Sequence, residues 1–221
     1  MKIGLIADPH ANLIALEAVL KDMEPVDRII CAGDLIGYNP YPNETIALLM
    51  DKNVHCVAGE HDKAAVSGDT QWFNHETAKT LKWTIGRLDR ENLRFLETLP
   101  DHIDLDGITV YHGNPNSIKD IAFEYDQEKM CHVFESIDQK IFVFGHTHIP
   151  VYKICGDRII LNPGSVGQPR DGISKASYAI YDTSSRVYNL HRVDYDIEIV
   201  QKQILLEGLP EIMAERLGYG R

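Results

Sequence analysis

Residues 3–10 read IGLIADPH, a short apolar run that ends directly in Asp8 and His10. Four later stretches share this design, since each is an apolar segment followed at once by side chains that can bind a metal ion. They are RIICAGD at 28–34, VHCVAGEHD at 54–62, ITVYHGN at 108–114 and IFVFGHTH at 141–148. In open α/β sheets the carboxyl ends of the strands form the functional crevice, because loops there are free of core packing while the strands fix their positions. The five stretches therefore predict one site built from five strand ends.

The first half of the chain alternates apolar runs with helical patterns, which is typical of βαβ units. Helical spacing of apolar residues continues over 74–99, where Pro100 ends it. Predicted strands cover 2–7, 27–31 and 54–58, and predicted helices cover 11–23, 43–51 and 74–99.

From Ile103 onward the pattern changes to closely spaced strands, with predicted hairpin turns at 156–157 and 183–186. We expect the strands at 108–111, 141–144, 151–155, 158–161, 178–181 and 187–192, and helices at about 126–135 and at 197–206. The implied architecture is two packed sheets with helices outside.

The composition is that of an ordinary globular protein, with 44% of the 221 residues hydrophobic and 25% charged. This length suits one core, so a single domain over residues 1–221 is expected. The formal charge of −11 argues against stable nucleic-acid binding, which needs a basic surface. No apolar run is long enough to span a membrane, and MKIGLIAD is too short for a signal peptide, so we expect a cytoplasmic protein.

The cysteines have no C-x-x-C spacing, which argues against a zinc knuckle or a redox dithiol. In a cytoplasmic protein they are expected to remain reduced and to pack as small buried hydrophobes. They are Cys31, Cys56, Cys131 and Cys155.

The residues after the first three strands each permit a metal-binding and a structural interpretation. Asp8 and His10 can reach one side of an extended segment, but an aspartate there also suits the cap of the following helix. Asp34 offers two oxygens that can bridge two metal ions, or it serves a turn. In 59–62 a ligand, an acid–base histidine and an orienting carboxylate stand in succession, and the alternative is a polar loop that begins a helix.

The later histidines divide into ligand candidates and others. His112 ends an apolar strand and is either a ligand or a buried boundary histidine. His146 and His148 can present two imidazoles to one site, so metal binding is favoured there. The remaining histidines lack a neighbouring ligand pattern and are expected to have structural or surface roles. They are His55, His75, His102, His132 and His191.

Taken in order, DPH, GD, GEHD, H and GHTH resemble the motif series of the calcineurin-like metallophosphoesterases, D-x-H, G-D, G-N-H-[DE], H and G-H-x-H. GDLIGYNPYPNE at 33–44 and NPGSVGQPRDG at 162–172 are similar to the small bacterial and archaeal phosphodiesterase branch. The resemblance covers nearly the whole chain. It implies an α/β fold that is a four-layer α/β/β/α sandwich of two mixed sheets flanked by helices.

The resemblance also implies a dinuclear metal site. Asp8, His10 and His148 would hold the first metal ion, Glu60, His112 and His146 the second, and Asp34 would bridge them. Nitrogen and oxygen ligands without cysteine suit manganese first, with iron, zinc or nickel as alternatives, and suit calcium less.

The implied activity is hydrolysis of a small phosphoester, a phosphodiester in preference to a monoester. A metal-bridging hydroxide would attack phosphorus in line, His61 would protonate the leaving oxygen, and Asp62 would orient the His61 ring. One alternative is a phosphomonoesterase or nucleotide pyrophosphohydrolase. Another is a weakly active or non-catalytic scaffold on the same fold, like the retromer subunit that resembles this family.

Three residues are candidates for substrate binding. Asn162 and Ser165 stand in the N-P-G-S loop, where the alternative is a purely structural tight loop. Arg170 is a candidate phosphate clamp, against an ordinary surface arginine. Residues 71–73 carry two aromatic side chains that would form a lid, a homodimer surface or ordinary core.

Two positions depart from the family's motifs. Ala11 stands where a glycine is usual, and Glu60 stands where the family has asparagine. Glutamate still offers an oxygen ligand, but it adds a negative charge and removes an amide donor. We expect metal binding to be retained, with turnover weakened or monoanionic diesters favoured over dianionic monoesters.

Overall fold

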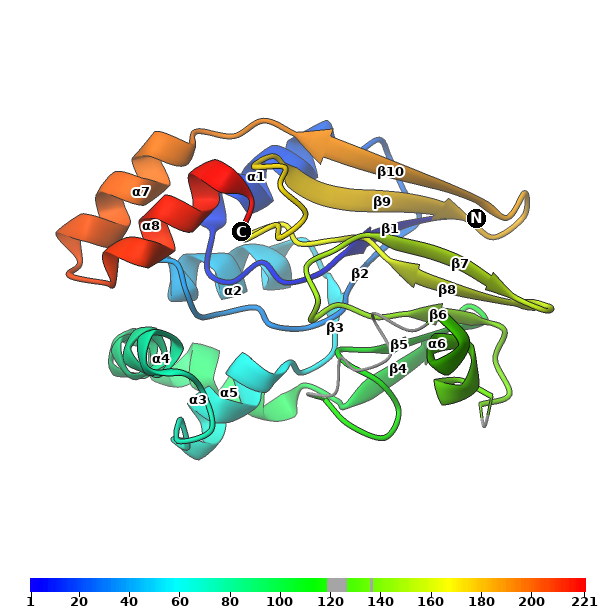
Figure 1. Ribbon diagram of the computed structural model, residues 1–221, viewed down its shortest axis with the longest axis horizontal. Helices are drawn as coiled ribbons and strands as arrows, with labels where there is room; N and C mark the ends of the chain where they lie inside the picture. The colour runs from blue at the N-terminus through cyan, green and yellow to red at the C-terminus, as the bar shows by residue number, and fades with distance from the viewer. Residues whose placement is uncertain (119–126, 136) are drawn as a thin grey trace.

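The computed structural model describes residues 1–118, 127–135 and 137–221, and it contains two five-stranded sheets packed against each other (Figure 1). The first sheet has the order β10-β9-β1-β2-β3, in which β1, β2 and β3 are parallel and β9 runs antiparallel to both of its neighbours, β1 and β10. Its strands are β1 (Lys2–Ile6), β2 (Arg28–Cys31), β3 (His55–Cys56), β9 (Ala176–Asp182) and β10 (Val187–Val193).

The second sheet has the order β4-β5-β6-β8-β7, with β5, β6 and β8 parallel and an antiparallel strand at each edge. Its strands are β4 (His102–Leu105), β5 (Ile108–Tyr111), β6 (Ile141–Val143), β7 (Val151–Cys155) and β8 (Arg158–Asn162). Both sheets are mixed, as predicted.

The core between the sheets follows from the alternation of side chains along β1. Ile3 and Leu5 pack with Val110 and Leu161 of the second sheet, whereas Ile6 packs with Leu16 of the covering helix. Because successive side chains of a strand point to opposite faces, one apolar strand supports both layers.

Helices cover both outer faces, which confirms the predicted four-layer sandwich (Figure 1). Met130 on α6 and Phe134 just after it pack on Phe142 of β6 and on Phe144, which follows β6. None of the helices in the described parts of the chain has both the length and the apolar composition needed to cross a bilayer. The helices are α1 (Leu13–Asp22), α2 (Pro42–Asp51), α3 (Glu60–Ser67), α4 (His75–Arg87), α5 (Arg90–Thr98), α6 (Gln127–Val133), α7 (Ile197–Leu206) and α8 (Glu211–Tyr219).

Two helix predictions need correction. The helical stretch 74–99 is two helices, because Leu88 is extended and the Asp89 side chain caps α5 by accepting from Asn92 N at 2.8 Å. The helix at 197–206 was predicted as the last element, but α8 follows it and packs on α7 through Met213 and Leu217. Residue 126, the predicted start of α6, lies outside the described residues.

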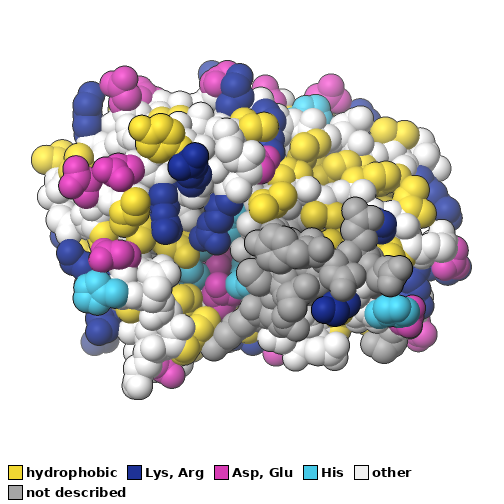
Figure 2. Space-filling view, in the orientation of Figure 1, with side chains coloured by type: hydrophobic (Ala, Val, Ile, Leu, Met, Phe, Trp, Pro, Cys, Tyr) yellow, Lys and Arg dark blue, Asp and Glu magenta, His cyan; other side chains and the backbone are white. Residues whose placement is uncertain are grey.

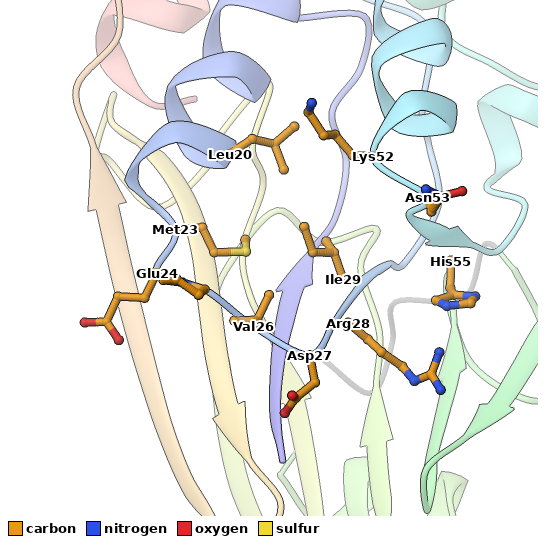
Figure 3. Close-up of a pocket in the computed structure, with 11 residues that line it drawn as sticks. Leu20, Met23, Glu24, Val26, Asp27, Arg28, Ile29, Lys52, Asn53 and His55 are labelled. Atoms are coloured by element: carbon orange, nitrogen blue, oxygen red, sulfur yellow. The ribbon is translucent and has the colours of Figure 1, made fainter.

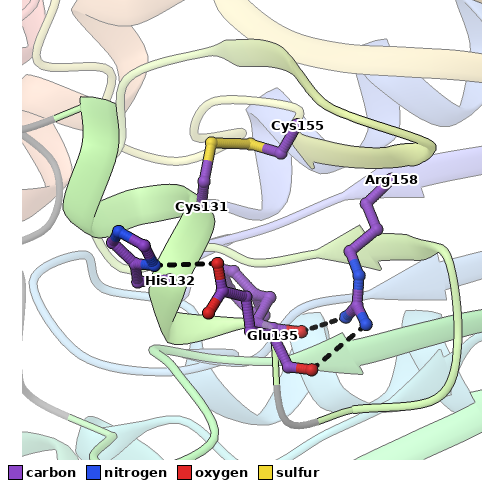
Figure 4. The surroundings of a disulfide bond; sticks show 6 residues. Cys131, His132, Glu135, Cys155 and Arg158 are labelled. Atoms are coloured by element: carbon purple, nitrogen blue, oxygen red, sulfur yellow. Dashed lines mark hydrogen bonds and ion pairs between the residues drawn. A yellow bond between two sulfur atoms is a disulfide. The ribbon is translucent and has the colours of Figure 1, made fainter.

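A disulfide bond joins Cys131 of α6 to Cys155 at the end of β7 (Figure 4). Arg158 supports the same junction by donating to the carbonyl oxygens of Phe134 and Ile137. The expectation that all four cysteines are reduced, buried thiols is therefore wrong for this pair. It holds for Cys31 and Cys56, which are free and buried. A pairing across 24 residues is decided by tertiary packing, which cysteine spacing does not reveal.

We expect the Cys131→Ser variant to unfold more easily than the oxidised wild type, by up to about 3 kcal/mol, because the cross-link restricts the unfolded chain. Chemical denaturation with and without reductant measures this difference, which should vanish once the wild type is reduced. Thiol titration of unfolded, unreduced protein should find two thiols, those of Cys31 and Cys56. Finding four would show that the bond is absent.

Candidate metal centre

The predicted ligands follow five strands and meet at one edge of the two sheets. Most of them have a backbone conformation that is unusual for residues with a side chain, since φ is 52° at Asp8, 47° at His10, 54° at Asp34, 65° at His146 and 61° at His148. Left-handed residues of this kind concentrate at functional sites, where the surrounding structure holds them. The tight turns let successive side chains point into the same space.

Asp8, His10 and His148 form the first cluster, with one ligand atom of each within 4.8 Å of the others. His10 Nδ1 lies 3.1 Å from the carbonyl oxygen of Ile36, and His148 Nδ1 lies 2.5 Å from that of Gln168. A carbonyl accepts only from a protonated nitrogen, so both Nε2 atoms carry lone pairs. These Nε2 atoms are 3.0 Å apart. Two facing lone pairs repel each other unless a cation lies between them.

Glu60, His112 and His146 form a second cluster with the same design. His112 Nδ1 lies 2.7 Å from the Ala32 carbonyl oxygen and donates to it, so Nε2 faces the carboxylates of Asp34 and Glu60, each 3.4 Å away. Burial opposes protonation of this ring, but the two carboxylates outweigh burial and raise the pKa of His112, so a metal ion would take the place of the proton at Nε2. That Nε2 lies 3.3 Å from His146 Nδ1, and the Glu60 carboxylate lies 2.5 Å from the same Nδ1. Carbonyl groups that fix the tautomer of a ligating histidine are a regular feature of metal sites.

The Asp34 carboxylate lies between the two clusters. Its Oδ2 atom is 3.6 Å from His10 Nε2 in the first and 3.4 Å from His112 Nε2 in the second. Its Oδ1 atom accepts from the backbone N–H of His61 at 2.9 Å, which fixes the orientation of the carboxylate. This is the position that a bridging ligand requires.

The electrostatics of the site also suit cations. Burial lowers the pKa of His10 and of His148 well below the ordinary value, which favours the neutral imidazole that binds metal. Burial opposes ionisation of Asp34, but His112 and His61 outweigh it and lower the pKa of Asp34 to about 2. Asp8 Oδ2 is buried and has no hydrogen-bond partner within the described residues. Divalent cations would satisfy these groups, so the donor set fits two metal ions.

His61 lies beside the clusters with its ring held on three sides. The ring centroid is 4.7 Å from that of His10, 4.6 Å from Tyr38 and 5.0 Å from Phe73. Its Nδ1 atom faces Gly37, since a Cβ placed on that glycine would lie 2.3 Å from it. Phe73, from the segment expected to form a lid, a dimer surface or core, thus forms a wall of the site.

Asp62 does not perform the predicted task of orienting the His61 ring. It is buried, and its carboxylate accepts from the backbone N–H groups of Leu35, Ile36 and Gly59, the closest at 2.9 Å. Within the described residues His61 Nδ1 has no hydrogen-bond partner. Asp62 therefore holds together the two loops that carry Asp34 and Glu60, and packing orients the imidazole.

Asn162 and Ser165, the predicted substrate donors, bind the backbone of two ligand loops in this structure. Both are fully buried. Asn162 Nδ2 donates to the carbonyl oxygen of Gly145 at 2.8 Å, and Ser165 Oγ donates to that of Asp8 at 2.8 Å. The N-P-G-S loop thus fixes the backbone of two ligand loops, which is the structural alternative.

Arg170 and Tyr38 flank the centre on the side of α8. Arg170 Nη2 lies 3.2 Å from Tyr38 Oη, and the Tyr38 ring lies 4.5 Å from the His10 ring. Tyr38 was not among the predicted site residues. It stands in the GDLIGYNPYPNE stretch, but a tyrosine in a loop carries no local signal for a metal site.

For the hydrolysis that the sequence resemblance implies, we expect Gly37→Ala to lower turnover about 10²-fold, because the added methyl group would displace the His61 ring from its position. Gly37 has a φ of +95°, so some loss of stability is expected as well. Gly68→Ala is the matched control, since Gly68 has a φ of +74° but open space around it. Steady-state kinetics and thermal unfolding of both variants separate the two effects, and equal losses of turnover would contradict the role of Gly37.

A pocket of about 380 Å³ lies at the amino ends of β1 and β2, the end of the sheet opposite to the candidate metal centre (Figure 3). Its charged groups already have partners, as Arg28 pairs with Asp106 at 2.9 Å and Lys52 with Asp51 at 2.8 Å. The other side chains that line it are largely apolar, such as Leu20, Met23 and Ile29. Among the residues that the structure describes, the groups of potential metal ligands lie at the carboxyl ends of the strands.

Comparison with known proteins shows the family of this chain. The calcineurin-like phosphoesterase superfamily domain matches residues 1–186. The uncharacterised protein MJ0912 of Methanocaldococcus jannaschii is 36% identical over 99% of this chain and 98% of its own. A metallophosphoesterase from Sphaerobacter thermophilus is 36% identical, with a TM-score of 0.88 over 100% of this chain and 99% of that one. The hypothetical protein PH1004 of Pyrococcus horikoshii, 23% identical, shares the fold with a TM-score of 0.85 over 100% and 98% of the two chains. This chain belongs to the calcineurin-like phosphoesterase superfamily.

Proposed function

We propose that this protein is a dinuclear metal-dependent phosphodiesterase. The observation that carries the proposal is the pair of unprotonated Nε2 atoms of His10 and His148, 3.0 Å apart, with a second cluster of the same design beside it. Asp8, His10 and His148 would hold one metal ion, and Glu60, His112 and His146 the other. The nitrogen and oxygen donors favour manganese, with iron, zinc or nickel as alternatives.

When bound, the two metal ions supply a neutralising charge for the phosphoryl oxygens and lower the pKa of the attacking water. Asp34 keeps the two clusters at a fixed separation, and Asp62 holds the loops that carry Asp34 and Glu60. His61 is placed to protonate the leaving oxygen. Its buried ring and the wall formed by Phe73 limit the access of water to this proton.

The preference for diesters rests on charge. Three carboxylates face the centre, so two divalent cations leave one net positive charge, where an asparagine at position 60 would leave two. A dianionic monoester gains more from the second charge than a monoanionic diester does. The charge of Glu60 therefore disfavours monoesters relative to diesters.

The direct test is hydrolysis of bis(p-nitrophenyl) phosphate and p-nitrophenyl phosphate by protein loaded with manganese, before and after chelation. We expect manganese-dependent hydrolysis in which the diester is the better substrate. Failure to hydrolyse either ester in the presence of any of the four metals would refute the proposal.

Glu60→Asn is expected to raise the rate on the monoester about tenfold relative to the diester. Two unit charges about 5 Å apart interact with an energy of about 3 kcal/mol at an effective dielectric constant of about 20. Solvent at the site reduces this interaction energy, which is why about tenfold is expected. Glu60 is the partner of His146 and His112, so metal content must be measured for both proteins. An unchanged ratio of the two rates at equal metal content would show that this charge does not select the substrate.

We also propose that residues 1–221 work as one domain, because α8, which lies beyond the residues matched by the family, packs through the Met213 and Leu217 cluster on Tyr38 of the site.

A further inference from the structure

A cavity of about 580 Å³ lies beside the candidate metal centre, between α8 and the loops that carry Tyr38 and Arg170. Its lining includes Arg170, Arg216, Arg221 and Tyr219. In the space-filling view, Lys and Arg side chains gather over α8 above a hollow in which histidine and acidic side chains are visible (Figure 2). The cavity is thus lined by basic side chains, and it shares Tyr38 with the surroundings of the metal centre.

Tyr38 connects the cavity to the centre. Its ring contacts His10 and His61 on one side, at 4.5 and 4.6 Å between centroids, and lines the cavity on the other. A phosphorus atom at the metal ions would have one ester group beside Tyr38. The cavity that this ring lines then receives the remainder of that group.

The charges in the cavity are unusual for this protein. Three arginines line it together with one carboxylate, that of Glu215, in a chain whose formal charge is −11. Elsewhere in the fold Arg28, Arg87 and Arg192 pair with carboxylates, as Arg87 does with Glu207 at 2.8 Å. Within the described ranges, none of the three cavity arginines forms an ion pair, and Arg170 contacts only neutral groups. Convergent guanidinium groups without counterions are a site for a phosphate group.

The remaining lining suits an aromatic base. Tyr219 is 67% exposed, and the Arg221 guanidinium lies 5.9 Å from its ring centroid. A large, exposed aromatic ring beside cations provides a surface on which a nucleobase stacks.

We infer that this cavity binds the second phosphate and adjoining base of a nucleotidyl phosphodiester whose first phosphate lies at the metal centre. This inference rests on the proposed function and names its substrate class. Such a substrate has two phosphates, one hydrolysed and one held by Arg216 and its neighbours. It explains why basic side chains accumulate at one place on an acidic protein.

The test compares the dinucleotides pTpT and TpT, which differ only in a terminal phosphate, as substrates of the manganese-loaded enzyme. The wild type should have a kcat/KM at least about tenfold higher for pTpT, and Arg216→Gln should remove this advantage. Arg216 lies on α8, outside the catalytic machinery, so the rate on bis(p-nitrophenyl) phosphate should stay within about twofold. The matched control is Arg94→Gln, which removes an exposed arginine from α5. It should change neither the advantage of pTpT over TpT nor the rate on bis(p-nitrophenyl) phosphate.

Equal rates on pTpT and TpT in the wild type, or an advantage that survives in Arg216→Gln, would overturn the inference. If the wild type hydrolyses no diester at all, that result would instead contradict the proposed function. In that case equilibrium binding of pTpT and TpT to the metal-loaded protein tests the cavity without turnover. Tighter binding of pTpT that Arg216→Gln abolishes supports it, and equal affinities refute it.

Discussion

Asp34→Asn is expected to lose at least about 10³-fold in manganese-dependent hydrolysis of bis(p-nitrophenyl) phosphate, equivalent to about 4 kcal/mol of transition-state stabilisation. The substitution preserves the shape of the side chain, and the amide oxygen can still accept from His61 N–H. It removes the charge that lies 3.6 Å from His10 Nε2 and 3.4 Å from His112 Nε2. The two clusters would no longer share a ligand.

The same variant should lose most of the thermal stabilisation that manganese gives the wild type. A ligand at about 1,000 times its dissociation constant stabilises the folded state by about 4 kcal/mol. For a chain of 221 residues this raises Tm by about 10 °C. Thermal unfolding with and without manganese, and elemental analysis, measure both effects.

His75→Ala controls for metal binding by surface histidines, since His75 is exposed at the start of α4. It should keep both the activity and the rise in Tm. A manganese-induced rise that survives in Asp34→Asn at full size would contradict the bridging role, and no rise in the wild type would contradict the metal centre itself.

The strands and the ligand set were predictable because both are local signals. Each apolar run ends next to its ligand in the sequence, and parallel strands bring their carboxyl ends to one edge. The motif series then assigned the ligands to two groups, and the structure brings together the same two groups. The left-handed conformation at Asp8 and His148 was not predictable, since neither residue type requires it.

Other features depend on partners far apart in the chain. Asp62 stands next to His61 in sequence, which suggested a contact, but it begins a helix and its carboxylate turns toward the Leu35 loop. Ser165 binds the backbone of Asp8, 157 residues away. Hydrogen-bond partners at such separation follow from sheet topology, so a sequence pattern identifies the polar residue without identifying what it holds.

The strained ligand loops persist because the surrounding backbone holds them. The N–H of Asp8 donates to Gly33 O at 3.0 Å, that of His10 to Asp34 O at 3.0 Å, and that of Gly167 to Asp8 O at 3.0 Å. The loops after β1 and β2 and the N-P-G-S loop therefore form one hydrogen-bonded unit. Ligand geometry is set by this unit before any metal binds, which lowers the cost of ordering the site.

His61→Asn is expected to lower hydrolysis of TpT by about 10²- to 10⁴-fold, the usual contribution of a general acid. The alkoxide that leaves TpT is strongly basic and needs a proton as the ester bond breaks. The p-nitrophenolate that leaves bis(p-nitrophenyl) phosphate is stable near neutral pH and needs none. The loss on the chromogenic diester should therefore be less than about tenfold.

This difference between the two substrates separates proton donation from a structural role. His61 belongs to neither of the two triads assigned to the metal ions, but its ring lies within 4.8 Å of ligand atoms of His10 and Asp34, so metal content is measured in His61→Asn and the rates are compared at equal metal content. Its ring is packed by His10, Tyr38 and Phe73, and loss of this packing would lower turnover of both diesters alike. Phe73→Leu serves as the comparison, because it loosens the same packing while the imidazole remains. It should affect the two substrates equally. Equal losses on both diesters in His61→Asn would assign the residue to packing alone, and proton donation would then have to come from water.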